Sequence, residues 1–167
     1  SYHGDRLKLI KKIDKECENL GLKFKHHLFI TRFALLKRII SRKINIGDLK
    51  YLSTKMINSD EIVKYYKTSS SVLDIENLGQ YGLTMRTFEV LASGLKLLTT
   101  NTNIINESIY HESNILLLDR KNITLDKSFF KKSNFYNEKI LKYSVHNWVL
   151  NIFNIKHSGY QPKRKSC

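Results

Sequence analysis

The fold is decided by three neighbouring segments: Ser-Val-Leu-Asp-Ile at 71–75, Gly-Leu-Thr-Met-Arg-Thr-Phe-Glu-Val-Leu-Ala-Ser-Gly at 82–94, and Leu-Lys-Leu-Leu-Thr at 95–99. The first and third are short apolar runs typical of strands. The second places Phe88 and Leu91 on one face of a helix that ends at Gly94. A strand, a helix and a second strand in this order require a crossover connection, so the two strands are expected to be parallel.

The same alternation extends over most of the chain. Helical spacing of apolar residues and strand-like runs predict helices over 5–20, 33–41, 60–68, 83–93 and 140–153, and strands over 24–30, 49–52, 71–75, 95–99 and 114–118. Strands that alternate with helices indicate an α/β protein, and we expect a Rossmann-like, doubly wound parallel sheet.

Two of these helices carry specific expectations about the core. In the helix over 5–20, the apolar residues at helical spacing are Leu7, Ile10, Ile13, Cys17 and Leu20. In the helix over 33–41, the pattern predicts that Phe33, Leu36 and Ile40 point inward and that the basic residues between them face water. The helix over 60–68 is expected to begin after Ser59 as its N-cap.

Length and composition fit one folded domain. The chain has 167 residues, of which 41% are hydrophobic and 26% charged, so a disordered or fibrous chain is excluded. We expect one domain over 1–155 and a basic, disordered tail over 156–167. The chain contains 29 Lys and Arg but only 15 Asp and Glu, so its formal net charge is +14. This charge favours nucleic acid, a phosphorylated small molecule or an acidic membrane surface as partner.

Other classes of function receive little support. The longest apolar runs are far below the roughly 20 residues of a membrane span, and no signal-peptide pattern precedes the first helix, so a cytoplasmic location is expected. The first residue is Ser1 rather than methionine, which suggests a piece of a longer protein.

Two cysteines, Cys17 and Cys167, give no metal-ligand spacing, and His26 and His27 would point to opposite faces of a strand. No metal is expected.

Two loops could bind a ligand, because ligands of open parallel sheets bind where strands lead into helix N-termini. In the segment 1–6, the backbone amides, His3 and Arg6 could meet a phosphate. The alternative is an ordinary N-cap at Asp5.

The second loop runs over 74–82 into the helix over 83–93. There a strand that ends in the carboxylate of Asp74 leads into Gly82, Thr84 and Arg86, which could form a cradle for a diphosphate. Glu89 could accept two hydrogen bonds from a ribose diol. The alternative is an ordinary surface ion pair between Arg86 and Glu89, three residues apart.

The segment 82–101 resembles the donor site of GT-B glycosyltransferases of bacterial lipopolysaccharide and capsular polysaccharide biosynthesis. Ser-Val-Leu-Asp-Ile at 71–75, Tyr-Ser-Val-His-Asn-Trp at 143–148 and Ser-Tyr-His-Gly-Asp-Arg at 1–6 are also similar to members of this family. The resemblance implies that residues 1–155 are the C-terminal, nucleotide-sugar-binding half of a GT-B fold, and that residue 1 directly follows its first strand.

The resemblance also implies roles for particular residues. Gly82, Thr84 and Arg86 would bind the donor diphosphate, and Glu89 the donor ribose. Many retaining members have a second glutamate eight positions before the ribose-binding one, where this chain has Tyr81. A glycan or lipid-linked acceptor would bind through an N-terminal domain outside this chain, and the site would need no metal.

Two alternatives remain open, and peripheral membrane contact is a further hypothesis. The chain could be a truncated, noncatalytic remnant of such an enzyme. It could be a basic nucleic-acid-binding protein, although no motif of that class is present. The basic residues around the helix over 33–41 could also bring the chain to an anionic membrane surface at the inner face of the cytoplasmic membrane, although its apolar face is expected to be core.

Overall fold

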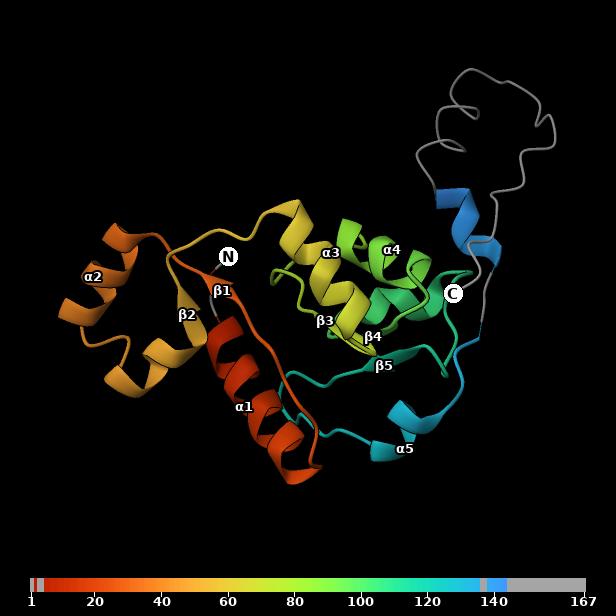
Figure 1. Cartoon of the computed structure of the whole chain (residues 1–167), viewed down its shortest axis with the longest axis horizontal. Helices are drawn as coiled ribbons and strands as arrows, with labels where there is room; N and C mark the ends of the chain where they lie inside the picture. The colour runs from red at the N-terminus through yellow and green to blue at the C-terminus, as the bar shows by residue number, and fades with distance from the viewer. Residues whose placement is uncertain (1, 3–4, 136–137, 144–167) are drawn as a thin grey trace, which may run out of the picture.

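The computed structural model describes residue 2 and the ranges 5–135 and 138–143. Helices and short strands alternate along them (Figure 1). The expected tail over 156–167 lies outside the described residues, as does the expected helix over 140–153 beyond its first residues. The described part of that helix belongs to η3, a 3₁₀ helix over Glu138–Tyr143.

The first part of the chain contains α1 (Arg6–Asn19), β1 (Leu28–Phe29), α2 (Arg32–Ile40) and β2 (Leu52–Ser53). A 3₁₀ helix, η1 (Ile46–Tyr51), precedes β2. The expected strand over 24–30 is thus reduced to two residues. The prediction of a strand over 49–52 is wrong for most of its length. Residues 49–51 belong to η1, whose start is stabilised by a capping box between Asn45 and Asp48.

The second part contains α3 (Ser59–Thr68), β3 (Ser71–Asp74), α4 (Met85–Ala92), β4 (Lys96–Thr99) and β5 (Ile115–Leu117). These follow the expected order. The N-cap of α3 is one residue earlier than expected: Asn58 Oδ1 accepts a hydrogen bond from the Glu61 amide, and the Glu61 side chain accepts one from the Asn58 amide. The remaining short elements are η2 (Thr102–Asn106) and α5 (Lys127–Lys131).

All pairings between the described strands are parallel, which makes this a mixed α/β structure with parallel strands. The strands form two small sheets, one of order β1-β2 and one of order β3-β4-β5. In the larger sheet Val72 lies beside Leu97, and Leu97 beside Ile115.

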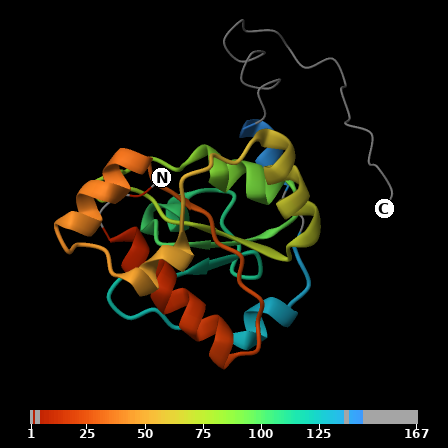
Figure 2. The same cartoon turned by 60° about the vertical axis from the view of Figure 1, so that its left-hand side comes forward.

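Helices cover both faces of the β3-β4-β5 sheet. Figures 1 and 2 show α3 and α4 on one side of it and α1 and α5 on the other. Adjacent residues of β4 divide between two hydrophobic clusters: Leu97 packs with Val90 of α4, and Leu98 with Ile13 of α1 and Phe129 of α5. The expected core face of the first helix is confirmed for Leu7, Ile10, Ile13 and Cys17, which are all buried.

Tyr2 and Arg6 connect the two sheets. The Tyr2 amide donates a hydrogen bond to the Phe29 carbonyl of β1 at 2.7 Å. The Arg6 guanidinium donates to the carbonyl of Ile75, directly after β3, also at 2.7 Å. These two residues therefore contact the end of one strand from each sheet.

The orientation predicted for the second helix is wrong. Phe33, Leu36 and Ile40 are 79%, 58% and 74% exposed, and no residue of α2 is buried. The inner face of α2 instead carries half-buried residues, among them Leu35 and Arg38, whose guanidinium lies 4.3 Å from the centre of the Tyr2 ring. Helical spacing identifies an apolar face, but it cannot say whether another part of the protein covers that face.

Among the residues that the structure describes, no helix is long and apolar enough to cross a membrane.

The contrast between α1 and α2 predicts different costs for the same substitution. Ile13 is 1% exposed in the core, so Ile13→Ala should lower the free energy of unfolding by roughly 3 kcal/mol. Ile40→Ala on the exposed face should change it by less than about 0.5 kcal/mol. Urea denaturation followed by circular dichroism measures both, and equal losses in the two variants would contradict the exposed position of α2.

Candidate functional site

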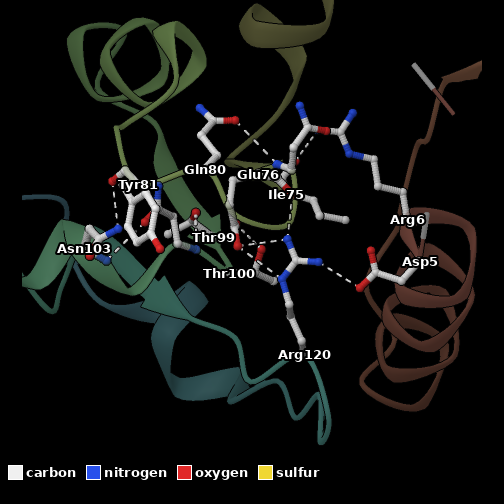
Figure 3. A network of polar contacts seen from close by, with 12 residues as sticks. Asp5, Arg6, Ile75, Glu76, Gln80, Tyr81, Thr99, Thr100, Asn103 and Arg120 are labelled. Carbon is white, nitrogen blue, oxygen red and sulfur yellow. Dashed lines mark hydrogen bonds and ion pairs between the residues drawn. The ribbon is translucent and has the colours of Figure 1, made fainter. Parts of the chain in front are cut away.

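Polar residues gather where the three strands of the larger sheet end. Glu76 follows β3, Thr100 follows β4 and Arg120 follows β5. Because the strands are parallel, these ends lie at one edge of the sheet, where ligands of open α/β sheets bind. Figure 3 shows that the three side chains meet there, beside Asp5 and Arg6 at the start of α1.

Arg120 connects these segments. Its Nε and Nη2 atoms donate to Glu76 Oε1 at 3.1 and 2.8 Å, and Nη2 also donates to the Glu76 carbonyl at 2.6 Å. Its Nη1 donates to Asp5 Oδ2 at 2.8 Å. The second carboxylate oxygen of Glu76 accepts a hydrogen bond from the Thr100 hydroxyl. One guanidinium thus joins the loops after β3 and β5 to the N-cap residue of α1.

Two carboxylates at this edge are buried and hydrogen-bonded. Glu76 is bound by Arg120 and Thr100, and Oδ2 of Asp74, the last residue of β3, accepts hydrogen bonds from the hydroxyls of Thr84 and Thr87 at the start of α4. Asp74 therefore places negative charge at the N-terminus of α4, where the helix dipole stabilises it.

Two further arginines lie close enough to Arg6 to influence its charge. Burial lowers the pKa of Arg6, Asp74 opposes this shift, and the nearby cations Arg120 and Arg86 lower the pKa further. Burial also lowers the pKa of Arg120, but its hydrogen bonds to the Glu76 and Asp5 carboxylates raise it more, so the net shift is upward. This edge therefore combines several cations with paired acids, rather than forming a purely basic pocket.

The loop before α4 is held by hydrogen bonds from residues that follow the neighbouring strand, β4. The side chain of Asn101, which follows β4, donates to the Gly82 carbonyl at 3.1 Å. Asn103 donates to the Tyr81 carbonyl at 2.7 Å. Thr84 is the N-cap of α4, and its hydroxyl oxygen accepts a hydrogen bond from the Thr87 amide at 3.2 Å.

The structure brings together most of the residues expected to bind a donor. Gly82, Arg86 and Glu89 are exposed around the first turns of α4. Thr84 lies with them, but its hydroxyl donates to Asp74, so the residue is already engaged within the protein. No ion pair within 4.0 Å joins Arg86 and Glu89, although the structure describes both; instead the Tyr66 hydroxyl donates to Glu89 at 3.5 Å.

The first predicted loop is placed in part. Arg6 reaches the same edge through its bond to the Ile75 carbonyl, whereas His3 lies outside the described residues. Asp5 is the N-cap residue of α1, as the alternative interpretation expected. Its side chain makes no capping hydrogen bond and instead pairs with Arg120.

Sequence reasoning included Asp74 as the carboxylate that ends a strand, but it missed Arg120, Thr100 and Asn101. Each of these three follows the end of an apolar strand, and that position could have identified them. Glu76 was not among the residues expected to bind a ligand, and in the structure its carboxylate is bound by Arg120 and Thr100.

The described histidines have structural partners. His26 lies 4.9 Å from the Tyr51 ring centre, and burial lowers its pKa. His27 contacts the Lys55 carbonyl at 2.8 Å, and His111 stacks on Phe135. His146 lies outside the described residues. Within the ranges that the structure describes, no group of three or more His, Cys, Asp or Glu side chains could hold a metal ion.

A small cavity of about 90 Å³ lies away from this edge, next to Gly94 at the end of α4 and Asn114 at the start of β5. It is well below the roughly 300 Å³ of small-molecule pockets. The candidate site is therefore the exposed surface at the carboxyl ends of the strands, not this cavity.

Comparison with known protein families, with curated proteins and with solved structures finds no match.

The Arg120 network yields a stability prediction. Its side chain is only 17% exposed, so Arg120→Ala should lower the free energy of unfolding by roughly 3 kcal/mol, because the Glu76 carboxylate is left buried without its cation. Adding Glu76→Gln should recover part of this loss. Urea denaturation measures both effects, with Lys121→Ala at the exposed neighbouring position as the control.

If Arg120→Ala costs no more than Lys121→Ala, the network does not hold the strand ends together.

Proposed function

We propose that this chain is the nucleotide-sugar-binding domain of a GT-B glycosyltransferase that transfers a sugar to a lipopolysaccharide, capsule or exopolysaccharide acceptor. The observation that carries the proposal is the position of α4. Its N-terminus, Arg86 and Glu89 are exposed at the carboxyl edge of a parallel sheet, beside the polar residues that end all three strands.

The arrangement of the strands supports a Rossmann-like, doubly wound sheet as the complete form of this domain. In the larger sheet, Lys96 donates to the Ser70 carbonyl, so the backbone groups of Ser71 and Leu73 face away from β4. In the smaller sheet, Phe29 faces away from β2 and accepts the bond from Tyr2.

A further parallel strand that leads into Tyr2 would satisfy both open edges and join the sheets in the order β2-β1-new strand-β3-β4-β5. This is the usual strand order of a dinucleotide-binding sheet, in which the first strand lies in the middle. It also agrees with the family resemblance, in which residues 1–6 follow the first strand of the domain. In the proposed enzyme, the segment before Ser1 supplies that strand.

The diphosphate of the donor would bind at the start of α4. The amides of Met85 and Arg86 are in its first turn, where backbone N–H groups have no acceptor within the helix, and the Arg86 guanidinium adds a permanent charge. Gly82 leaves room for an anion to approach the backbone, since no atom outside Tyr81, Gly82 and Leu83 lies within 4 Å of where its Cβ would be. Because its hydroxyl donates to Asp74, Thr84 would act by shaping this turn.

The ribose of the donor would bind to Glu89, one turn further along α4. Its carboxylate is exposed and has only a long hydrogen bond of 3.5 Å from the Tyr66 hydroxyl, so both oxygens remain accessible to a diol. Arg86 and Glu89 are three residues apart, so both can contact one nucleotide from the same helix.

These residues would assist displacement at the anomeric carbon of the sugar. Negative charge develops on the departing diphosphate, and the α4 dipole and the Arg86 guanidinium would stabilise it without a metal. The acceptor would come from a second domain. Leu78, Tyr81 and Met85 are large, exposed side chains beside the proposed donor site and would face that domain.

Thermal shift with UDP, GDP, CDP and ADP tests the proposal. A nucleotide at about 100 times its dissociation constant adds roughly 2.7 kcal/mol, a shift of several degrees in a domain of this size. One of the four should raise the Tm at physiological salt. Arg86→Ala and Glu89→Ala should abolish the rise, whereas Arg32→Ala and Glu112→Ala, at exposed positions outside the site, should retain it.

Two outcomes would contradict the proposal. A folded protein whose Tm responds to no nucleotide would favour a noncatalytic remnant. A salt-sensitive response to an oligonucleotide alone would favour nucleic-acid binding.

A further inference from the structure

Helix α2 presents an apolar face to the outside of the molecule. Phe33, Leu36 and Ile40 follow one another at intervals of three and four residues, so they form one stripe, and each is more than half exposed. Ile39 at the edge of this stripe is 42% exposed. Figure 1 shows α2 at one end of the molecule, projecting from the β1-β2 side.

This orientation is set by contacts on the opposite side of the helix. Leu35 and Arg38 are half-buried there, and the Arg38 guanidinium lies over the Tyr2 ring at 4.3 Å. The Thr31 side chain caps the first turn by accepting from the Ala34 amide at 3.3 Å. The apolar stripe is therefore displayed by a helix that is anchored through its other face.

The stripe is bordered by cations. Arg32 and Lys37 are exposed on either side of it, since a helix turns about 100° per residue, and Arg42 and Lys43 follow directly after α2. The charged side chains between Glu18 and Asp48 are all basic. No acidic side chain of α2 or of the rest of 19–47 offsets this charge.

We infer that the α2 face binds an anionic phospholipid surface. Exposed apolar side chains on one helix face with flanking Lys and Arg are the features of an interfacial helix, whose apolar stripe enters the headgroup boundary while its cations pair with lipid phosphates. A second copy of the same face would bring like charges together. Nucleic acid fits this face less well, because bases stack on aromatic side chains and Leu36 and Ile40 are aliphatic. The inference is independent of the proposed glycosyltransferase activity.

Flotation of the whole chain with vesicles tests the inference. The vesicles contain either phosphatidylcholine alone or phosphatidylcholine with phosphatidylglycerol, at low and at physiological salt. We expect binding to the anionic vesicles only, weakened by salt. Arg32→Gln with Lys37→Gln should weaken it by about fivefold for each cation removed.

The apolar stripe is tested separately. Leu36→Gln with Ile40→Gln should reduce binding by roughly tenfold for each side chain. Matched controls on other surfaces are Lys64→Gln with Lys67→Gln for the charge, and Met56→Gln with Val63→Gln for exposed apolar residues. These pairs should bind vesicles as the unchanged protein does. Because all four pairs are exposed, circular dichroism should show the same fold in each.

Several results would overturn the inference. These are the absence of binding to anionic vesicles at low salt, equal binding to neutral vesicles, and control pairs that weaken binding as much as the α2 pairs. Dimerisation through this face without binding to vesicles would also overturn it. In that case the unchanged protein would sediment as a dimer and the Leu36→Gln/Ile40→Gln variant as a monomer. So would a preference for an oligonucleotide over the vesicles.

Discussion

The hydrogen bonds of the Arg120 guanidinium hold together the edge of the sheet at which the strands have their carboxyl ends. The guanidinium spans the loops after β3 and β5 and the start of α1, through Glu76 and Asp5. The loop after β4 joins through Thr100, which donates to the same glutamate. Segments far apart in the sequence are thereby held at one edge by charge-assisted hydrogen bonds, which are the strong class of hydrogen bond.

This constraint explains why acidic residues occur where an anion is proposed to bind. Glu76 is paired with the Arg120 cation, and Asp74 is stabilised by hydrogen bonds from the Thr84 and Thr87 hydroxyls and by the positive end of α4. Arg86, whose described neighbours include no ion-pair partner within 4.0 Å, remains available for a ligand. The buried acids build the framework, and the proposed ligand residues lie on its exposed side.

The sequence predicted the order of helices and parallel strands because apolar spacing is a local property, and the buried stripe of α1 is an example. It failed where burial depends on the rest of the protein. The stripe of α2, with Phe33 and Ile40, has the same periodicity as a core face but is exposed. The site was predicted around Gly82 and Glu89, which share one segment, whereas Arg120 was missed because its partners are distant in the sequence.

The most direct test of the proposed donor site is residue-resolved chemical-shift mapping of the labelled protein during titration with the nucleoside diphosphates. We expect the effect of one nucleotide to saturate and to shift the amides of Gly82, Met85 and Arg86 at the start of α4. Saturable shifts confined to other surfaces, or no shifts at millimolar nucleotide, would contradict the proposed donor site.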